Sequence, residues 1–144
     1  MTSARDIMHT GATCVSEHDT LTTAAQRMRE FDVGALPIWG DDDRLHGIIT
    51  DRDIVIKCVA AGQDPAIMTA GDLAQGDIYR IDAEADISEV ITVMEEHQIR
   101  RLPVLNGERL VGIISEADIA RHLPEHAIGS FVETVCAPKS LPRR

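Results

Sequence analysis

The chain contains the same segment twice, and this internal repeat limits its fold more than any other feature. Shifting the sequence by 66 positions places Leu36-Pro37 on Leu102-Pro103. After one residue is lost in a turn, Asp53-Ile54 meets Asp118-Ile119. So ordered a match indicates a duplicated segment, and the two copies are expected to share one fold.

Each copy has the pattern of a helix, two strands and a second helix. Apolar residues recur at helical spacing over 21–31 and over 87–94. Thr20 and Asp86 stand where helix N-caps are expected. Asn106-Gly107, between two apolar runs, predicts a β-hairpin. The expected strands and closing helices are, in chain order, 36–39, 45–50, 53–61, 102–105, 110–115 and 118–123.

The repeat also divides the chain into domains. The first copy covers 4–62, a connection covers 63–71, the second copy covers 72–123, and a tail without counterpart covers 124–144. A copy of roughly 60 residues is only marginally stable alone, so the two copies are expected to bury their sheets together. Such packing creates an approximate twofold axis with a similar cleft on either side.

Composition excludes several classes of protein. With 24 acidic and 14 basic side chains, the net charge of −10 argues against nucleic acid as a partner. Aromatic residues make up 3%, which predicts an aliphatic core. No apolar run approaches the ~20 residues that span a membrane. The stretch 1–6 lacks the apolar segment of a secretory signal, so we expect a cytoplasmic protein.

With this order of elements the chain resembles a tandem pair of CBS domains, a Bateman module. The resemblance implies an α/β (α+β) fold of two β-α-β-β-α repeats with pseudo-twofold symmetry. Three segments carry the resemblance, and each occurs once in each copy. They are Ala4-Arg5-Asp6-Ile7-Met8 with Ala70-Gly71-Asp72-Leu73, Gly34-Ala35-Leu36-Pro37-Ile38 with Arg100-Arg101-Leu102-Pro103-Val104, and Gly47-Ile48-Ile49-Thr50-Asp51-Arg52-Asp53 with Gly112-Ile113-Ile114-Ser115-Glu116-Ala117-Asp118.

The resemblance also implies a function. Without an attached catalytic domain, the chain is similar to the stand-alone hypoxic response proteins of actinobacteria. We therefore expect a non-catalytic regulatory or stress-response protein that binds an adenosyl ligand, such as AMP, ATP or S-adenosylmethionine, in clefts between its two domains. The family further implies a homodimer, and regulation implies a protein effector whose identity the sequence does not give.

Family motifs assign the ligand contacts to a hydroxyl and a carboxylate where a strand meets a helix. Thr50 with Asp53 and Ser115 with Asp118 match these positions. An ionised carboxylate accepts both hydroxyl donors of a ribose, which suits a nucleoside. The alternative is that these four residues only cap helices.

Two arginines distinguish the second copy. Arg100 and Arg101 stand where the first copy has Gly34 and Ala35. A guanidinium suits bidentate contact with a phosphate, which favours the second copy for an anionic nucleotide. A surface salt bridge with Glu95 or Glu96 is the alternative.

Two prolines and an acidic run complete the nucleotide hypothesis. Pro37 and Pro103 lie in strands where the family lines its adenine cleft. The run Asp41-Asp42-Asp43 is interpreted as a solvated turn, which would repel a polyphosphate if it lay near the cleft.

Zinc binding or redox chemistry, with the clefts unoccupied, is the alternative function. Imidazoles and thiolates are good zinc ligands. His122 and His126 are the first choice of ligands, because residues four apart share one face of a helix. The available ligands are His9, His18, His46, His97, His122, His126, Cys14 and Cys136.

The cysteines allow one disulfide. A bridge between Cys14 and Cys136 would fasten the tail to the module, whereas Cys58 lies among apolar residues of an expected helix and is assigned to the core. No nucleophile motif or phosphate-binding glycine loop is recognisable, so no enzymatic activity is expected.

Overall fold

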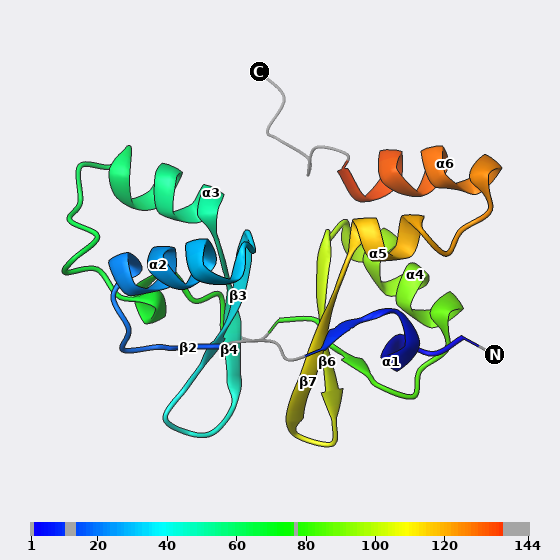
Figure 1. Cartoon of the computed structure of the whole chain (residues 1–144), viewed down its shortest axis with the longest axis horizontal. Coiled ribbons are helices and arrows are strands. Elements are labelled where there is room, and N and C mark those ends of the chain that lie inside the picture. The colour runs from blue at the N-terminus through cyan, green and yellow to red at the C-terminus, as the bar shows by residue number, and fades with distance from the viewer. Residues whose placement is uncertain (1, 11–13, 77, 137–144) are drawn as a thin grey trace. The chain divides into compact units, whose positions relative to one another are not determined.

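The structure is a computed structural model that describes residues 2–10, 14–76 and 78–136. The chain forms two compact units (Figure 1). The first-repeat unit comprises residues 12–78, and the second-repeat unit comprises residues 1–11 together with 79–144. Each unit has its own sheet and its own apolar core, which confirms the predicted mixed α and β class.

The first-repeat unit is built on a three-stranded sheet in the order β2-β3-β4. β2 runs parallel to β3, and β3 runs antiparallel to β4. The strands are β2 (Val15–Ser16), β3 (Ala35–Trp39) and β4 (Leu45–Thr50). The helices are α2 (Leu21–Phe31), α3 (Asp51–Asp53), the π-helix η1 (Ile54–Val59), which continues α3, and the 3-10 helix η2 (Ala70–Leu73).

The second-repeat unit has a four-stranded sheet in the order β1-β7-β6-β5. Its central pair β6 and β7 is the hairpin that Asn106-Gly107 predicts, and Gly107 has the positive φ of 65° that such a turn requires. The strands are β1 (His9–Thr10), β5 (Ile81–Asp82), β6 (Arg101–Asn106) and β7 (Arg109–Ser115). The helices are α1 (Ala4–Ile7), α4 (Ile87–His97), α5 (Glu116–Ala120) and α6 (Glu125–Cys136).

The N-terminal segment lies in the second-repeat unit, although the sequence repeat groups it with the first copy. β1 pairs antiparallel with β7, and His9 lies opposite Ile113. A Cβ atom at Gly112 would come within 2.6 Å of the His9 carbonyl oxygen. Glycine at position 112 therefore lets β1 approach β7. Backbone pairing of this kind leaves no trace in a repeat pattern.

Both predicted N-caps are confirmed. The Thr20 hydroxyl accepts a hydrogen bond from the Thr23 backbone N–H at 3.2 Å, where α2 begins. The Asp86 carboxylate accepts one from the Ser88 N–H at 3.0 Å, where α4 begins. Each cap satisfies one of the N–H groups that the first turn of a helix leaves without a partner.

The two cores are aliphatic, as the composition predicts, with a single buried aromatic side chain among the described residues. That side chain, Phe131, belongs to α6 and is 3% exposed. α6 packs on α4 and α5 and adds Val135 to the core of the second-repeat unit. Part of the tail is thus a structural helix. Among the described residues, no helix is long and apolar enough to cross a membrane.

Candidate functional site

The first family motif forms a reciprocal cap at the junction of β4 and α3. The Thr50 hydroxyl accepts from the Asp53 N–H at 3.1 Å, and the Thr50 N–H donates to Asp53 Oδ2 at 3.0 Å. Asp53 Oδ1 lies 3.5 Å from the Lys57 ammonium. The Asp53 side chain is 20% exposed. It is therefore a capping carboxylate that keeps contact with solvent.

The second motif has the same cap but a more enclosed carboxylate. Asp118 Oδ2 accepts from the Ser115 N–H at 2.8 Å and from the Ser115 hydroxyl at 2.9 Å. Asp118 Oδ1 lies 3.0 Å from Arg121 and 2.9 Å from His9 Nε2. The Asp118 side chain is 2% exposed. Both motifs cap helices, as the alternative interpretation holds, and their carboxylates differ in access.

Arg101 and Arg100 lie near the second motif in different ways. Arg101, half-buried in β6, pairs in register with Ser115. Arg100 is exposed, its carbonyl accepts the Glu116 N–H at 2.9 Å, and its side chain reaches the Cys136 thiol. Within the described ranges, neither arginine forms an ion pair with a glutamate of α4.

The two prolines occupy equivalent places in the two sheets. Pro37 pairs with Ile48, and Pro103 pairs with Ile113. Both prolines are buried. The neighbours of each proline, Leu36 with Ile38 and Leu102 with Val104, belong to the cores, so by strand alternation both prolines lie on the opposite face of their sheets.

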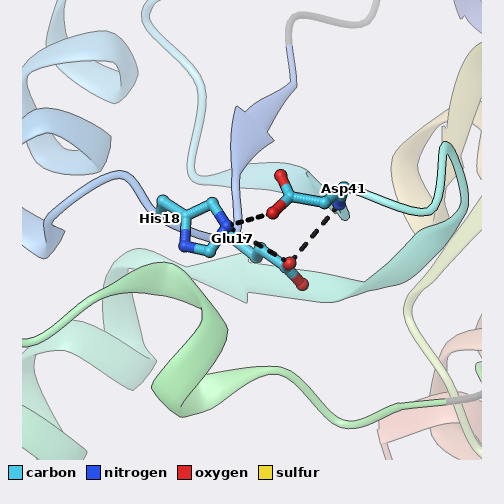
Figure 2. A group of neighbouring side chains, drawn as sticks. All are labelled: Glu17, His18 and Asp41. Carbon is cyan, nitrogen blue, oxygen red and sulfur yellow. Dashed lines mark hydrogen bonds and ion pairs between the residues drawn. The ribbon is translucent and has the colours of Figure 1, made fainter.

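A separate group of metal-ligating side chains lies in the first-repeat unit: Glu17, His18 and Asp41 (Figure 2). One ligand atom from each residue lies within 4.8 Å of the other two. His18 Nε2 is 2.5 Å from Asp41 Oδ2 and 3.5 Å from Glu17 Oε1. In the part of the chain that the structure describes, this is the one group of three or more such residues.

Strand pairing brings these residues together. β2 runs parallel to β3, with Ser16 opposite Trp39, so both strands end at the same edge. The residues that follow, Glu17 and Asp41, then meet there, and the Asp41 N–H lies 3.3 Å from Glu17 Oε1. A two-residue strand has too short a pattern to be recognised in the sequence. The acidic turn after β3 is the available signal in the sequence, but its pattern alone predicts only a solvated turn.

A second histidine extends the group through the other oxygen of Glu17. His46 Nδ1 is 3.3 Å from Glu17 Oε2, and His46 Nε2 is 2.7 Å from Asp42 Oδ1. A Cβ atom at Gly40 would lie 2.3 Å from His46 Nε2, so glycine at this position makes room for the imidazole. Glu17 thus links two imidazole–carboxylate pairs.

The charges in this group alter two pKa values. The hydrogen bond and the charge of Asp41 raise the pKa of His18. The hydrogen bond from His46 lowers the pKa of Asp42. Both groups are held toward their charged forms, which is the expected result of placing imidazoles among carboxylates.

The other candidate ligands are dispersed. His122 Nδ1 bonds the Asp118 carbonyl at 2.9 Å, and His97 stacks on Tyr79 with ring centroids 3.6 Å apart. His126 is exposed on α6. Within residues 2–10, 14–76 and 78–136, neither His122 nor His126 belongs to a group of three ligands.

The three cysteines have different surroundings. Cys58 is fully buried in the core of the first-repeat unit, as predicted. Cys14 is half-buried, and burial raises the pKa of its thiol. Cys136 donates to Glu116 Oε2 at 3.0 Å. The disulfide between Cys14 and Cys136 stays a prediction.

The sequence matches a known family and a known protein along most of its length. The family model of the CBS domain matches residues 4–59 and 70–125. Hypoxic response protein 1 of Mycobacterium tuberculosis is 67% identical over 141 residues, which cover 98% of this chain and 99% of that protein.

Solved structures also resemble the chain. A crystal structure of Hypoxic Response Protein I with two coordinated zinc ions is 68% identical, with a TM-score of 0.76, and the match covers 85% of this chain and 100% of that one. A crystal structure of CBSX2 in complex with AMP shares the fold at 20% identity, with a TM-score of 0.69 and coverage of 85% and 96%.

Proposed function

The chain belongs to the family of CBS-domain proteins, and from this premise we propose that it is a non-catalytic regulatory protein that binds zinc in its first-repeat unit. The observation that carries the proposal is the convergence of Glu17, His18 and Asp41 at one edge of the sheet (Figure 2). We extend the hypoxic response of the relative to this chain as its physiological setting.

The residues present suit zinc. Zinc in proteins takes imidazole nitrogen and carboxylate oxygen, with ligand distances near 2.0 Å, so neighbouring ligand atoms lie about 3.3 Å apart. The 3.5 Å between His18 Nε2 and Glu17 Oε1 is close to this separation. Asp41 adds a third ligand, and His46 lies beside the group through Glu17. Bound zinc would supply a divalent charge at a place where carboxylates already gather.

Zinc binding would stabilise the folded first-repeat unit. Glu17 follows β2, whereas Asp41 lies in the turn between β3 and β4, so one ion would join two parts of the sheet edge. An ion that binds only the folded chain adds about 2.7 kcal/mol when its free concentration is 100 times the dissociation constant. The relative whose crystal structure holds two coordinated zinc ions supports this proposal.

Elemental analysis of protein purified without an affinity tag tests the proposal. The wild type should contain stoichiometric zinc, and the variants H18Q and E17Q should lose it. The matched control H126Q changes an exposed histidine outside the group and should retain the metal. A wild type without zinc after dialysis against buffered zinc rejects the proposal. Loss of zinc in H122Q or H126Q, with zinc retained in H18Q and E17Q, would instead place the site at residues 122–126.

An adenosyl ligand at the first motif is the second candidate function. Asp53 is favoured because its carboxylate has one short hydrogen bond, from Thr50, and one longer contact, to Lys57, and because part of it meets solvent. It can accept the two hydroxyls of a ribose. Pro37, Pro103, Arg100, Arg101 and Ser115 remain proposed ligand contacts through the family resemblance.

Calorimetric titration with AMP, ATP and S-adenosylmethionine tests this second function. D53N should weaken binding of whichever ligand the wild type takes. D51N changes an exposed neighbour and is the matched control. Absence of heat with all three ligands and the folded wild type rejects an adenosyl ligand at Asp53.

A regulatory module acts on another molecule. We propose that this chain forms a homodimer and that the dimer acts on an effector protein. Val55, Ile56 and Val59 are each at least half exposed on η1. The repeat equates them with Ala120, Arg121 and Pro124, which offer little apolar surface. A second copy of the chain would cover the η1 surface. Light scattering tests the assignment. The assembly of V55D should have a lower mass than that of the wild type, and equal masses would mean that the η1 surface does not join the two copies.

A further inference from the structure

The two motif carboxylates have the same cap but different numbers of donors. Asp118 faces four: the N–H and hydroxyl of Ser115, the Arg121 guanidinium and His9 Nε2. Asp53 faces two: the Thr50 N–H and the Lys57 ammonium. An ionised carboxylate has about four acceptor positions, so Asp118 is saturated by the chain's own groups.

Two differences between the repeats cause this asymmetry. His9 corresponds to Gln75, and Arg121 corresponds to Ile56. The Gln75 side chain is directed to the backbone of β4, where its amide bonds both the N–H and the carbonyl of Ile48. Ile56 is half exposed on η1 and has no donor to offer. In the first-repeat unit, neither Gln75 nor Ile56 therefore donates to the motif carboxylate as His9 and Arg121 do in the second-repeat unit.

The position of His9 is fixed by backbone pairing. β1 places His9 opposite Ile113 of β7, two residues before Ser115. Gly112 admits the His9 carbonyl to a distance that a Cβ atom would not allow. The imidazole and the Arg121 side chain are both largely exposed, at 67% and 61%, whereas Asp118 beneath them is 2% exposed. The His9 imidazole and the Arg121 guanidinium therefore cover the carboxylate from the solvent side.

We propose that His9 and Arg121 form a built-in plug that closes the second motif. They occupy Asp118 Oδ1, the oxygen that a hydroxyl-bearing ligand would need, and Ser115 occupies Oδ2. Asp118 thereby fastens the N-terminal segment to α5, and Asp53 is the motif carboxylate that remains open. The sequence favours the second copy for an anionic nucleotide because of Arg100 and Arg101. The plug instead leaves the first motif as the one that a nucleotide can bind. The ligand chemistry here rests on the second function proposed above.

Exchanging the two plug residues for their equivalents in the first-repeat unit, Gln75 and Ile56, tests the inference. The variants are H9Q/R121I, the milder R121I, and H9Q/R121I/D118N. H126Q is the matched control. Each full-length protein is first compared with the wild type by circular dichroism and thermal melting, then titrated with AMP in the calorimeter after removal of metal. R121I keeps the β1–β7 pairing and is informative if the double variant does not fold.

The expected result is one additional AMP bound per chain in H9Q/R121I or in R121I, and its loss on adding D118N. If the wild type binds no AMP but the opened variant binds one, the plug is supported and the Asp53 proposal fails. Equal stoichiometry in the wild type and in every folded opened variant overturns the plug, whatever that stoichiometry is. Zinc content is measured separately, so the zinc proposal stands or falls on its own.

Discussion

The Cys136 thiol donates a hydrogen bond to the Glu116 carboxylate at 3.0 Å, joining the last residue of α6 to the first residue of α5. The Glu116 hydrogen bond, then burial and the Glu116 charge, raise the pKa of this thiol, and Arg100 opposes them. A thiol in these surroundings stays protonated at neutral pH and is a poor nucleophile. The contact thus serves to hold α6 rather than to supply a reactive cysteine.

Alkylation kinetics test this assignment. E116Q should lower the pKa of Cys136 and increase its rate of reaction with iodoacetamide at pH 8, because the thiolate fraction grows tenfold for each unit by which the pKa falls. R100Q should slow the same reaction, since Arg100 is the group that lowers the pKa. Mass spectrometry of the Cys136 peptide gives both rates. Equal rates in the wild type and E116Q would show that the hydrogen bond does not form in solution.

Phe131→Ala should destabilise the second-repeat unit. Phe131 is 3% exposed and belongs to its core, so truncation creates a cavity that costs about 3–5 kcal/mol. The neighbouring Val132 is 36% exposed, and Val132→Ala should change stability by about 0.5 kcal/mol or less. Urea unfolding followed by circular dichroism measures both. If F131A costs no more than V132A, α6 does not pack on the unit.

The elements shared by both copies could be predicted because local pattern and duplication agree. The strands 36–39 and 110–115 and the N-caps Thr20 and Asp86 all lie where the sequence places them. α6 could not be predicted in this way, since it has no copy to compare. Only its packing on α4 and α5 shows which of its apolar residues enter the core.

The metal-ligating group shows a different limit of sequence reasoning. Four-residue spacing predicts that His122 and His126 align as ligands on one helix. In the structure α5 ends at Ala120 and α6 begins at Glu125, so the two residues share no helix. Glu17 and Asp41 are brought together by strand pairing, which depends on residues far apart in sequence.

The His18–Asp41 contact should make stability depend on pH. Asp41 raises the pKa of His18 above its unfolded value of about 6.5. The contribution is therefore fully present below pH ~6.5 and is lost as the pH rises through the folded pKa. Without zinc, D41N should lower the melting temperature more at pH 5.5 than at pH 8.5. NMR titration should show the pKa of His18 falling in D41N, and the H18Q background should abolish the pH-dependent difference.

Gly112→Ala should displace the N-terminal strand. The added Cβ would meet the His9 carbonyl oxygen at 2.6 Å and the Met8 sulfur at 2.5 Å, so β1 must move away from β7. Overpacking of this kind costs about 1–3 kcal/mol. Because His9 is carried by β1, its contact with Asp118 should be lost as well, and backbone amides of residues 8–10 should exchange faster with deuterium.

Gly129→Ala, at an exposed helical site with open space around it, is the control and should be neutral or stabilising by up to about 1 kcal/mol. Unchanged exchange at residues 8–10 in G112A would mean that β1 tolerates the methyl group and that Gly112 does not set the position of His9.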